Sequence, residues 1–207
     1  MLANARYGFA KYIGIYREHI EQELASVGLY DLFLNNGSNR MSVENTVYRR
    51  LVDIFHQSAF AEIQNPDSKL RTYSILKTEI GCENYLSKIL SINDRKALTK
   101  FRLSNHSLMI EKGRHLGINK DARFCNFCLD KVEDENHFLL NCKTFEQHRS
   151  KLFEKANEKL RYFYRFNDKA KFIALLNNPK LTLCIGKYLF HTLELRDFLL
   201  EQHKNNV

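Results

Sequence analysis

The chain has 207 residues, of which 44% are hydrophobic and 27% charged, a composition typical of a globular protein rather than a disordered one. Only two Pro and eight Gly interrupt it, which favours long helices and argues against a β-sandwich. The formal net charge of +8 favours a polyanionic partner, nucleic acid first and an acidic membrane second, although many basic helical proteins bind neither.

The N-terminal part of the chain is predicted to form two helices. Apolar residues at helical spacing run from Tyr12 to Val27, and the Asn-Asn-Gly sequence at 35–37 is typical of a helix C-cap. Ser42 predicts the N-cap of a second helix, which the Asn-Pro pair at 65–66 ends. The apolar stripe along that helix indicates packing in a core, and its members are Val43, Val47, Leu51, Ile54, Phe55, Ala59 and Ile63.

Short helices are predicted in the middle of the chain. Two of them, broken at Gly81, are expected over residues 67–92. A further helix, capped by Asn93 or Asp94, is expected to end at Leu103. Beyond it, we expect an extended or looped connection that leads to Cys125. The two glycines that mark turns in this connection are Gly113 and Gly117.

A basic segment lies directly before the first cysteine pair. Between Arg95 and Arg123 there are eight basic residues and two acidic ones, a formal charge of +6. Such residues beside a rigid module are well placed to neutralise phosphates, while the alternative is a solvated helix face followed by a basic loop. The residues predicted to contact nucleic acid are Arg95, Lys96, Lys100, Arg102, Lys112, Arg114, Lys120, Arg123, Arg149 and Lys151.

The C-terminal part is again predicted to be helical. A helix with alternating charges is expected over 144–166, followed by a helix that Asn167 or Asp168 caps. The Asn-Asn-Pro sequence at 177–179 separates this helix from a last long one. The end of the first helix is basic and aromatic. Bases could stack on the rings of Tyr162 or Tyr164, although such residues more often pack at a helix end.

Four residues of the types that zinc prefers are close together in the sequence C-x2-C-x8-H-x4-C. A Cys-x-x-Cys turn can direct both thiolates at one ion, and an imidazole and a third thiolate complete a tetrahedral site. Because no position is left open for water, this pattern predicts one structural Zn²⁺ ion rather than a catalytic one. The predicted ligands are Cys125, Cys128, His137 and Cys142.

Other interpretations of the cysteines are weaker. A thioredoxin-type redox pair normally follows a strand in a βαβ unit, which the pattern here lacks. A disulfide framework does not fit five cysteines in a chain of this length without a signal-peptide core. Cys82 and Cys184 are in apolar helical contexts and are expected in the core, and His148 ranks well below His137 as a ligand. The acidic stretch 133–135 is expected to be a solvated loop.

No set of catalytic residues is recognisable. Ser, His and Asp occur without a known motif, and there is no glycine-rich phosphate loop. We therefore expect a protein that is not an enzyme. No apolar run approaches the length of a membrane span, and the N-terminus lacks a signal-peptide core, so the expected location is intracellular.

The order of these motifs resembles the C-terminal region of LINE-type (non-LTR) retrotransposon reverse transcriptase polyproteins. The similar segments are LRTYSILKTEIGCENYLSKI, RKALTKFRLSNHSLMIEKGRH and FCNFC…ENHFLLNC, within residues 68–150. The resemblance implies that the same four Cys and His residues bind zinc and that the module helps to hold template RNA or target DNA. It further implies a nuclear location and a reverse transcriptase domain of the same element as partner.

The sequence also departs from that family. Its polymerases need a Tyr/Phe-x-Asp-Asp turn, whereas Tyr30 and Asp31 are followed by Leu32. Pro66, Asp67 and Lys69 are too close together for a restriction-like nuclease site. The chain therefore resembles the tail of such an element standing alone, as a truncated or degenerate reading frame. The eight-residue gap before His137 also differs from the four-residue gap of the retroviral zinc knuckle.

The sequence thus predicts a mainly α protein in which a small zinc-knuckle-like module lies between helical halves. The expected parts are an N-terminal helical region at 1–92, the basic segment and zinc module at 93–150, and a C-terminal helical region at 151–207. The favoured function is non-catalytic binding of RNA or DNA with weak sequence preference. A zinc-stabilised protein-interaction module is the alternative, and a remnant with no selected function is a third interpretation. The oligomeric state is left open.

Overall fold

The fold is mainly α-helical, as the sequence predicted. The computed structural model describes residues 17–34, 40–65, 68–88 and 90–205. Within these ranges there is no β-strand, and the only β pairing is an isolated antiparallel bridge between Phe124 and Val132. A cluster of Cys and His residues lies between helical parts, which confirms the predicted fold class. The chain divides into two compact units, Met1–Glu62 and Ile63–Val207.

The first unit contains a helix at 17–26, the short α2 (Tyr30–Leu34) and most of α3 (Arg40–Gln64). The turn after the first helix is closed at Gly28, whose φ of 72° is easily adopted only without a side chain. Arg50 on α3 donates from Nε to the carbonyl oxygen of Val27 over 2.7 Å. This bond ties α3 to the turn.

α3 begins two residues before the predicted cap at Ser42 and ends next to the predicted stop at Asn65. Its apolar stripe is only partly buried, since Leu51 and Phe55 are exposed in this structure. The stripe is therefore less completely packed than its spacing predicted. The predicted C-cap at 35–37 and the apolar residues before residue 17 lie outside the described residues.

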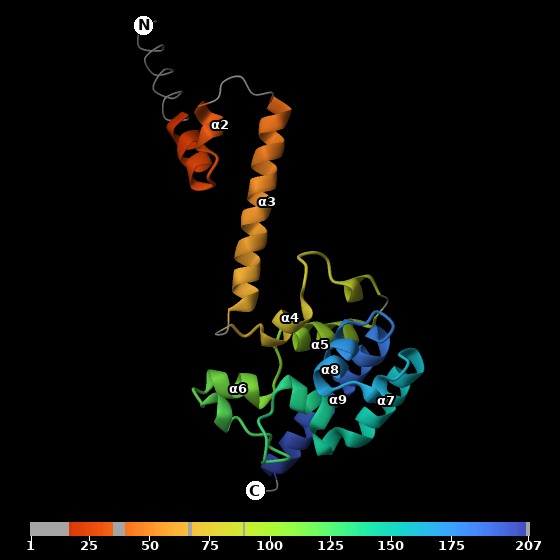
Figure 1. Ribbon diagram of the computed structural model, residues 1–207. Coiled ribbons are helices and arrows are strands. Elements are labelled where there is room, and N and C mark those ends of the chain that lie inside the picture. The colour runs from red at the N-terminus through yellow and green to blue at the C-terminus, as the bar shows by residue number, and fades with distance from the viewer. Residues whose placement is uncertain (1–16, 35–39, 66–67, 89, 206–207) are drawn as a thin grey trace, which may run out of the picture. The chain divides into compact units, whose positions relative to one another are not determined.

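The second unit is built around α9 (Thr182–Asn205), which runs beside α5 (Ile92–Arg102) and contacts α7 (Glu146–Lys159) and α8 (Asp168–Asn177) (Figure 1). α4 (Arg71–Leu76) packs against α8, and two single turns, η1 (Asn84–Ser87) and η5 (Phe163–Arg165), complete the connections. The core between these helices is apolar and fully buried, with Leu98, Phe101, Leu175, Ile185 and Leu189 among its members. The expected boundaries at 92/93 and 150/151 both fall inside this unit.

Side-chain caps begin two of these helices. Asn167 Oδ1 accepts a hydrogen bond of 2.8 Å from the backbone N of Ala170, which confirms one of the two predicted caps of α8. At α5 the cap is Ser91, whose hydroxyl accepts from the backbone N of Asp94 over 3.1 Å. The predicted cap at residue 93 or 94 was wrong by two or three residues, because Ser91 directly precedes Ile92, the first residue of the helix.

The predicted loop before the cysteines contains a further helix, α6 (Met109–His115). Gly113 is inside this helix and buried, so it does not mark a turn. Gly117 does mark one, because its φ of 69° ends the helix in the left-handed conformation. Two close glycines suggested a loop, but Gly113 is helical. Tertiary packing explains why this helical position is a glycine, because a Cβ there would lie 2.6 Å from Cγ of Arg123.

We expect Gly113→Ala to lower the free energy of unfolding by about 1 to 2 kcal/mol, because displacement of the Arg123 side chain outweighs the better helix propensity of Ala. Arg123 donates from Nε to the carbonyl of Ile118 over 2.9 Å and from Nη1 to that of Ile110 over 2.8 Å. Urea denaturation measures the change. In an Arg123→Ala background the same substitution should be neutral or stabilising, and an equal cost in both backgrounds would contradict this account.

Two further observations concern the unpaired cysteines and the membrane. Cys82 is exposed and Cys184 is half-buried, so the expectation of a core position is wrong for Cys82. Cys82 lies in the stretch between α4 and η1, which is not helical at that residue. No helix of the described chain combines the length and apolarity needed to cross a bilayer.

Candidate metal centre and its basic surroundings

Local backbone contacts shape the Cys-x-x-Cys loop. Cys125 donates from its backbone N to the carbonyl of Lys131 over 2.8 Å, and the isolated bridge at Phe124 adds to this pairing. The backbone N of Leu129 bonds back to the carbonyl of Cys125 over 2.9 Å, with φ of Leu129 at 60°. The chain therefore turns back on itself between the two cysteines and Lys131, and both thiols point to the same side.

The other half of the site is a single π-helical turn, η3 (His137–Asn141). Asp134 starts it, since its Oδ1 accepts from the backbone N of His137 over 2.7 Å. The turn closes when the backbone N of Cys142 donates to the carbonyl of His137 over 2.7 Å. This five-residue step places the imidazole and the third thiol together.

The four predicted ligands meet in space. The ligand atoms of Cys125, Cys128, His137 and Cys142 all lie within 4.8 Å of one another. Cys128 is partly buried and the other three residues are buried. Both ring nitrogens of His137 are buried without a hydrogen-bond partner, an arrangement that costs free energy unless one nitrogen binds an ion. These residues could hold a metal ion, whereas His148 is exposed and is not part of the cluster.

The thiols of the cluster lie within hydrogen-bond distance of one another. The Cys125 and Cys142 Sγ atoms are 4.0 Å apart, and those of Cys128 and Cys142 are 3.6 Å apart, too far for a disulfide bond. The hydrogen bond with Cys142, followed by burial, raises the pKa of Cys125 to about 12. The same hydrogen bond lowers the pKa of Cys142. Without a cation the cluster therefore keeps a proton that a metal ion would displace.

Aromatic rings and an arginine support the cluster from the interior. Phe145 contacts Phe127 and Phe138, with ring centres 5.9 and 5.0 Å apart. Arg149 on α7 is buried and donates from Nη1 to the carbonyl of Cys142 over 2.7 Å. The loop, the π turn and α7 are thus joined around the four ligands.

Glu133 and Glu135 next to the cluster are buried and Asp134 is half-buried, which corrects the expectation of a solvated loop. Glu133 is 0% exposed and accepts from Arg196 on α9 through both oxygens, over 2.7 and 2.6 Å. The backbone N of Met109 also donates to Glu133 Oε2 over 2.7 Å. The loop between Cys128 and His137 is therefore fastened to two other helices by one buried carboxylate.

A second buried carboxylate, Glu135, joins the loop to α4 and to the connection between α5 and α6. It binds Arg71 over 2.6 and 3.0 Å and His106 Nε2 over 2.8 Å. Burial alone would raise the pKa of Glu135, but the hydrogen bond and charge of His106 and then of Arg71 hold it at about 2. Since the unfolded value is about 4.3, this carboxylate stabilises the fold above that pH, and the contribution is lost as the pH falls toward 2.

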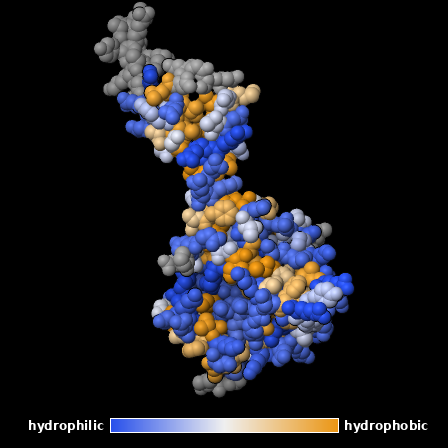
Figure 2. All heavy atoms as spheres, in the orientation of Figure 1, coloured by the Kyte–Doolittle hydropathy of each residue, from blue (hydrophilic) through white to orange (hydrophobic). Residues whose placement is uncertain are grey.

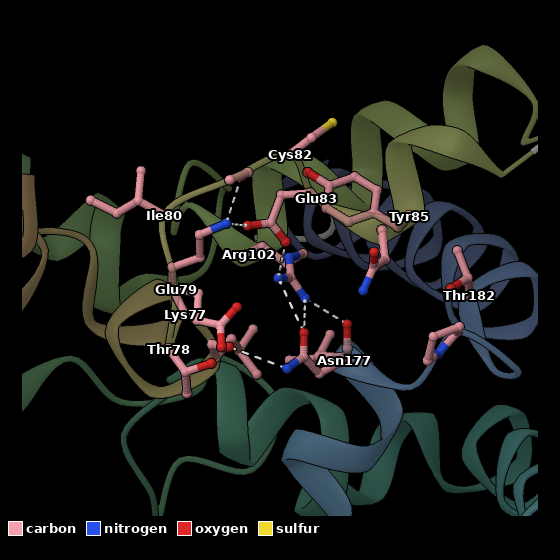
Figure 3. A pocket seen from close by; sticks show the side chains of 15 residues that line it. Lys77, Thr78, Glu79, Ile80, Cys82, Glu83, Tyr85, Arg102, Asn177 and Thr182 are labelled. Atoms are coloured by element: carbon pink, nitrogen blue, oxygen red, sulfur yellow. Dashed lines mark hydrogen bonds and ion pairs between the residues drawn. The ribbon is translucent and has the colours of Figure 1, made fainter. Parts of the chain in front are cut away.

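Arg102, a predicted phosphate ligand, is buried instead. Figure 3 shows its guanidinium group between Glu83 and Asn177, in a hollow of about 220 Å³. It binds Glu83 Oε2 and the carbonyl of Leu176, each over 2.6 Å. An arginine within a basic stretch looks solvated in sequence, but here it satisfies acceptors from two distant segments. The prediction for Arg102 is corrected accordingly.

The other predicted phosphate ligands have different fates. Arg149 is buried and Arg123 is held by backbone carbonyls, so neither guanidinium is directed at solvent. Arg114 is exposed but bonded to Glu111, which also binds Arg71. The exposed members of the set that form no ion pair within the described part of the chain are Arg95, Lys96, Lys100, Lys112, Lys120 and Lys151.

Two features of the surroundings were missed by the sequence reasoning. Arg196 is at helical spacing from the buried Ile185, Leu189 and Thr192. The sequence pattern could therefore have predicted a charged side chain on the core face of α9. The second feature is a cation-lined groove between α7 and α9, to which only Lys151 of the predicted set contributes. Its members are far apart in sequence, and only the packing of the two helices brings them together.

Comparison with protein-family models, curated proteins and solved structures gave no match. The resemblance of residues 68–150 to the retrotransposon region accordingly remains a prediction from the motifs.

Proposed function

We propose that this chain is a non-catalytic nucleic-acid-binding protein stabilised by one structural Zn²⁺ ion. In a tetrahedral site with Zn–S bonds of about 2.3 Å, the sulfur atoms are about 3.8 Å apart. The 4.0 and 3.6 Å separations around Cys142 fit this value. Three thiolates and one imidazole would hold the ion and fix the backbone between Cys125 and Cys142, and its chemistry would be structural.

The distribution of charge is the observation that supports nucleic acid as the partner. The second unit, 63–207, contains 26 Lys and Arg against 17 Asp and Glu, a formal charge of +9. The first unit contains 6 against 7, a charge of −1. Three of its acids pair with arginines in the interior, which removes equal numbers of both signs and leaves the excess of cations among the remaining side chains. Figure 2 shows hydrophilic side chains over most of its visible face.

The test is a salt titration of binding to labelled single-stranded RNA and duplex DNA, with the intact protein and with Cys125→Ser. We expect the logarithm of the affinity to fall steeply with the logarithm of salt, with a slope of roughly −3 to −4 for a single strand if about five phosphates are contacted. The variant should bind more weakly, because the cluster loses its order and no longer supports the cation-bearing helix α7, whose Arg149 donates to the carbonyl of Cys142. No binding of the intact protein at low salt would contradict the proposal.

A protein-interaction module is the second candidate, and α3 is the element that favours it. Tyr48, Leu51 and Phe55 are large, exposed side chains at helical spacing, as a partner helix would require. Binding to such a partner would be insensitive to salt. The same titration therefore separates the two functions, because apolar contacts lack the counterion release that accompanies phosphate binding.

A further inference from the structure

The groove between α7 and α9 has a lining without carboxylates. It is a hollow of about 330 Å³ whose walls carry Lys, His and apolar side chains and no Asp or Glu. The apolar floor includes Leu152 and Tyr188. Its six basic or imidazole side chains are His148, Lys151, Lys155, Lys159, Lys187 and His191.

The lysines of this groove form rows along the two helices. Lys151, Lys155 and Lys159 are spaced by four residues on α7, which places successive amines on one face about 6 Å apart along the axis. Lys187 faces them from α9, beside His191. This spacing is similar to that of neighbouring phosphates along a nucleic-acid strand.

Like charges at this spacing destabilise a helix unless counterions lie between them. None of the four lysines forms an ion pair within the described chain, and the acids Glu154 and Glu158 of α7 do not line the groove. Lys159 alone has a protein acceptor, since its Nζ donates to the carbonyl of Lys180 over 3.0 Å. The unpaired amines of the groove are therefore suited to an external anion that binds several of them at once.

Exposed aromatic residues follow directly after α7. The guanidinium groups of Arg161 and Arg165 each lie 4.9 Å from the ring centre of Tyr162. Tyr164 is 52% exposed. Aromatic and guanidinium planes of this kind are platforms for unpaired bases, which a duplex does not offer.

We infer that single-stranded nucleic acid binds along this groove, with phosphates on the lysines of α7 and α9 and bases on the arginine–tyrosine surface of 161–165. The inference rests on the proposed function and names the surface that performs it. It also moves the main contact away from the α5 and α6 cations that the sequence favoured. RNA and DNA strands share the phosphates and bases that this surface recognises, and a comparison of the two distinguishes them.

The experiment compares two triple variants that remove the same charge. Lys151→Gln, Lys155→Gln and Lys187→Gln together neutralise the groove, while Arg95→Gln, Lys96→Gln and Lys100→Gln neutralise α5. Affinity for fluorescein-labelled 12-nucleotide strands of RNA and of DNA is measured by anisotropy at several salt concentrations. Zinc content and thermal unfolding establish that each variant is folded, and all substituted side chains are exposed apart from their groove contacts.

The groove variant should bind single strands at least tenfold more weakly, with a salt slope that is smaller by about 2 for three lost phosphate contacts. The α5 variant should change the affinity by less than about threefold. Equal losses of affinity in both variants would contradict binding along the groove but would leave the proposed function unaffected. Failure of the intact protein to bind any strand at low salt would overturn both.

Two additional measurements separate base contacts from simple binding of anions. Tyr164→Leu should weaken binding of the strand about fivefold, whereas Tyr164→Phe, which keeps the ring, should not. Inorganic tripolyphosphate should compete with the strand in the intact protein and in Tyr164→Leu. If tripolyphosphate binds but no strand does, the groove is an anion site and the inference about nucleic acid is wrong. If Tyr164→Leu bound the strand with unchanged affinity, the inferred contact between the bases and Tyr164 would be wrong.

Discussion

Serine in place of Cys142 is expected to leave the protein without its metal ion and to unfold the segment between Cys125 and Cys142. Apparent binding free energies of structural zinc are about 10 to 16 kcal/mol in zinc-finger peptides, comparable with the whole stability of a domain. Cys142 is buried and close to both other thiols, so its loss removes the ligand on which the cluster closes. Zinc per chain, measured by atomic emission after dialysis, should fall from one to near zero.

The remaining cysteines supply matched controls for this experiment. Cys82 is exposed and Cys184 is half-buried, and neither belongs to the cluster. Cys82→Ser and Cys184→Ser should each retain one zinc ion and nearly the same unfolding curve. A strong chelator should reproduce the effect of Cys142→Ser in the intact protein. If Cys142→Ser kept a full equivalent of zinc, the assignment of the four ligands would be wrong.

Glu133→Gln is expected to lower the free energy of unfolding by about 3 to 5 kcal/mol, because it removes the buried counter-charge of Arg196 and leaves only the exposed carboxylate of Asp197 beside the guanidinium. Both partners are at most 1% exposed in their side chains. Gln also turns one acceptor into a donor that faces another donor. Urea denaturation of the zinc-saturated protein measures the change.

The companion variants test whether the pair acts as a unit. Arg196→Met should also be costly, because it leaves the Glu133 carboxylate buried and charged. The double variant should cost clearly less than the sum of the two single variants, since no unpaired charge remains. Arg114→Met is the surface control, expected to cost less than about 1 kcal/mol because its side chain is 40% exposed. Additive effects of the buried pair would show that the two residues are not coupled.

The cluster of candidate metal ligands was predictable because its determinants are local. All four residues fall within 18 positions, and two short-range structures, the Cys-x-x-Cys turn and the π-helical turn that begins at His137, bring them together. The caps that begin helices are similarly local, and the prediction at Asn167 was confirmed for this reason. The predicted caps Asn93 and Asp94 lie close to Ser91. The observed cap is Ser91, because its hydroxyl accepts from the free backbone N of Asp94.

The failures have a common physical origin. The helix α6 forms although it contains Gly113, and glycine is required there because the Arg123 side chain occupies the space that a larger residue would fill. Glu133 and Glu135 looked like a solvated acidic loop, but their partners Arg196 and Arg71 come from segments 63 and 64 residues away in the chain. The resemblance segment RKALTKFRLSNHSLMIEKGRH likewise contributes Arg102, His106 and Glu111 to polar contacts in the interior rather than to a surface.

The sequence by itself determined the mainly helical class, the four candidate metal ligands and the sign of the charge, since each depends on composition or on spacing within a few turns. Only the tertiary structure decided which cations remain on the surface. An arginine can neutralise a phosphate or satisfy a buried carboxylate, and its neighbours in sequence do not distinguish these fates. The packing of distant helices buried Arg102, Arg149 and Arg196, and the same packing placed Lys151 and Lys187 across one groove.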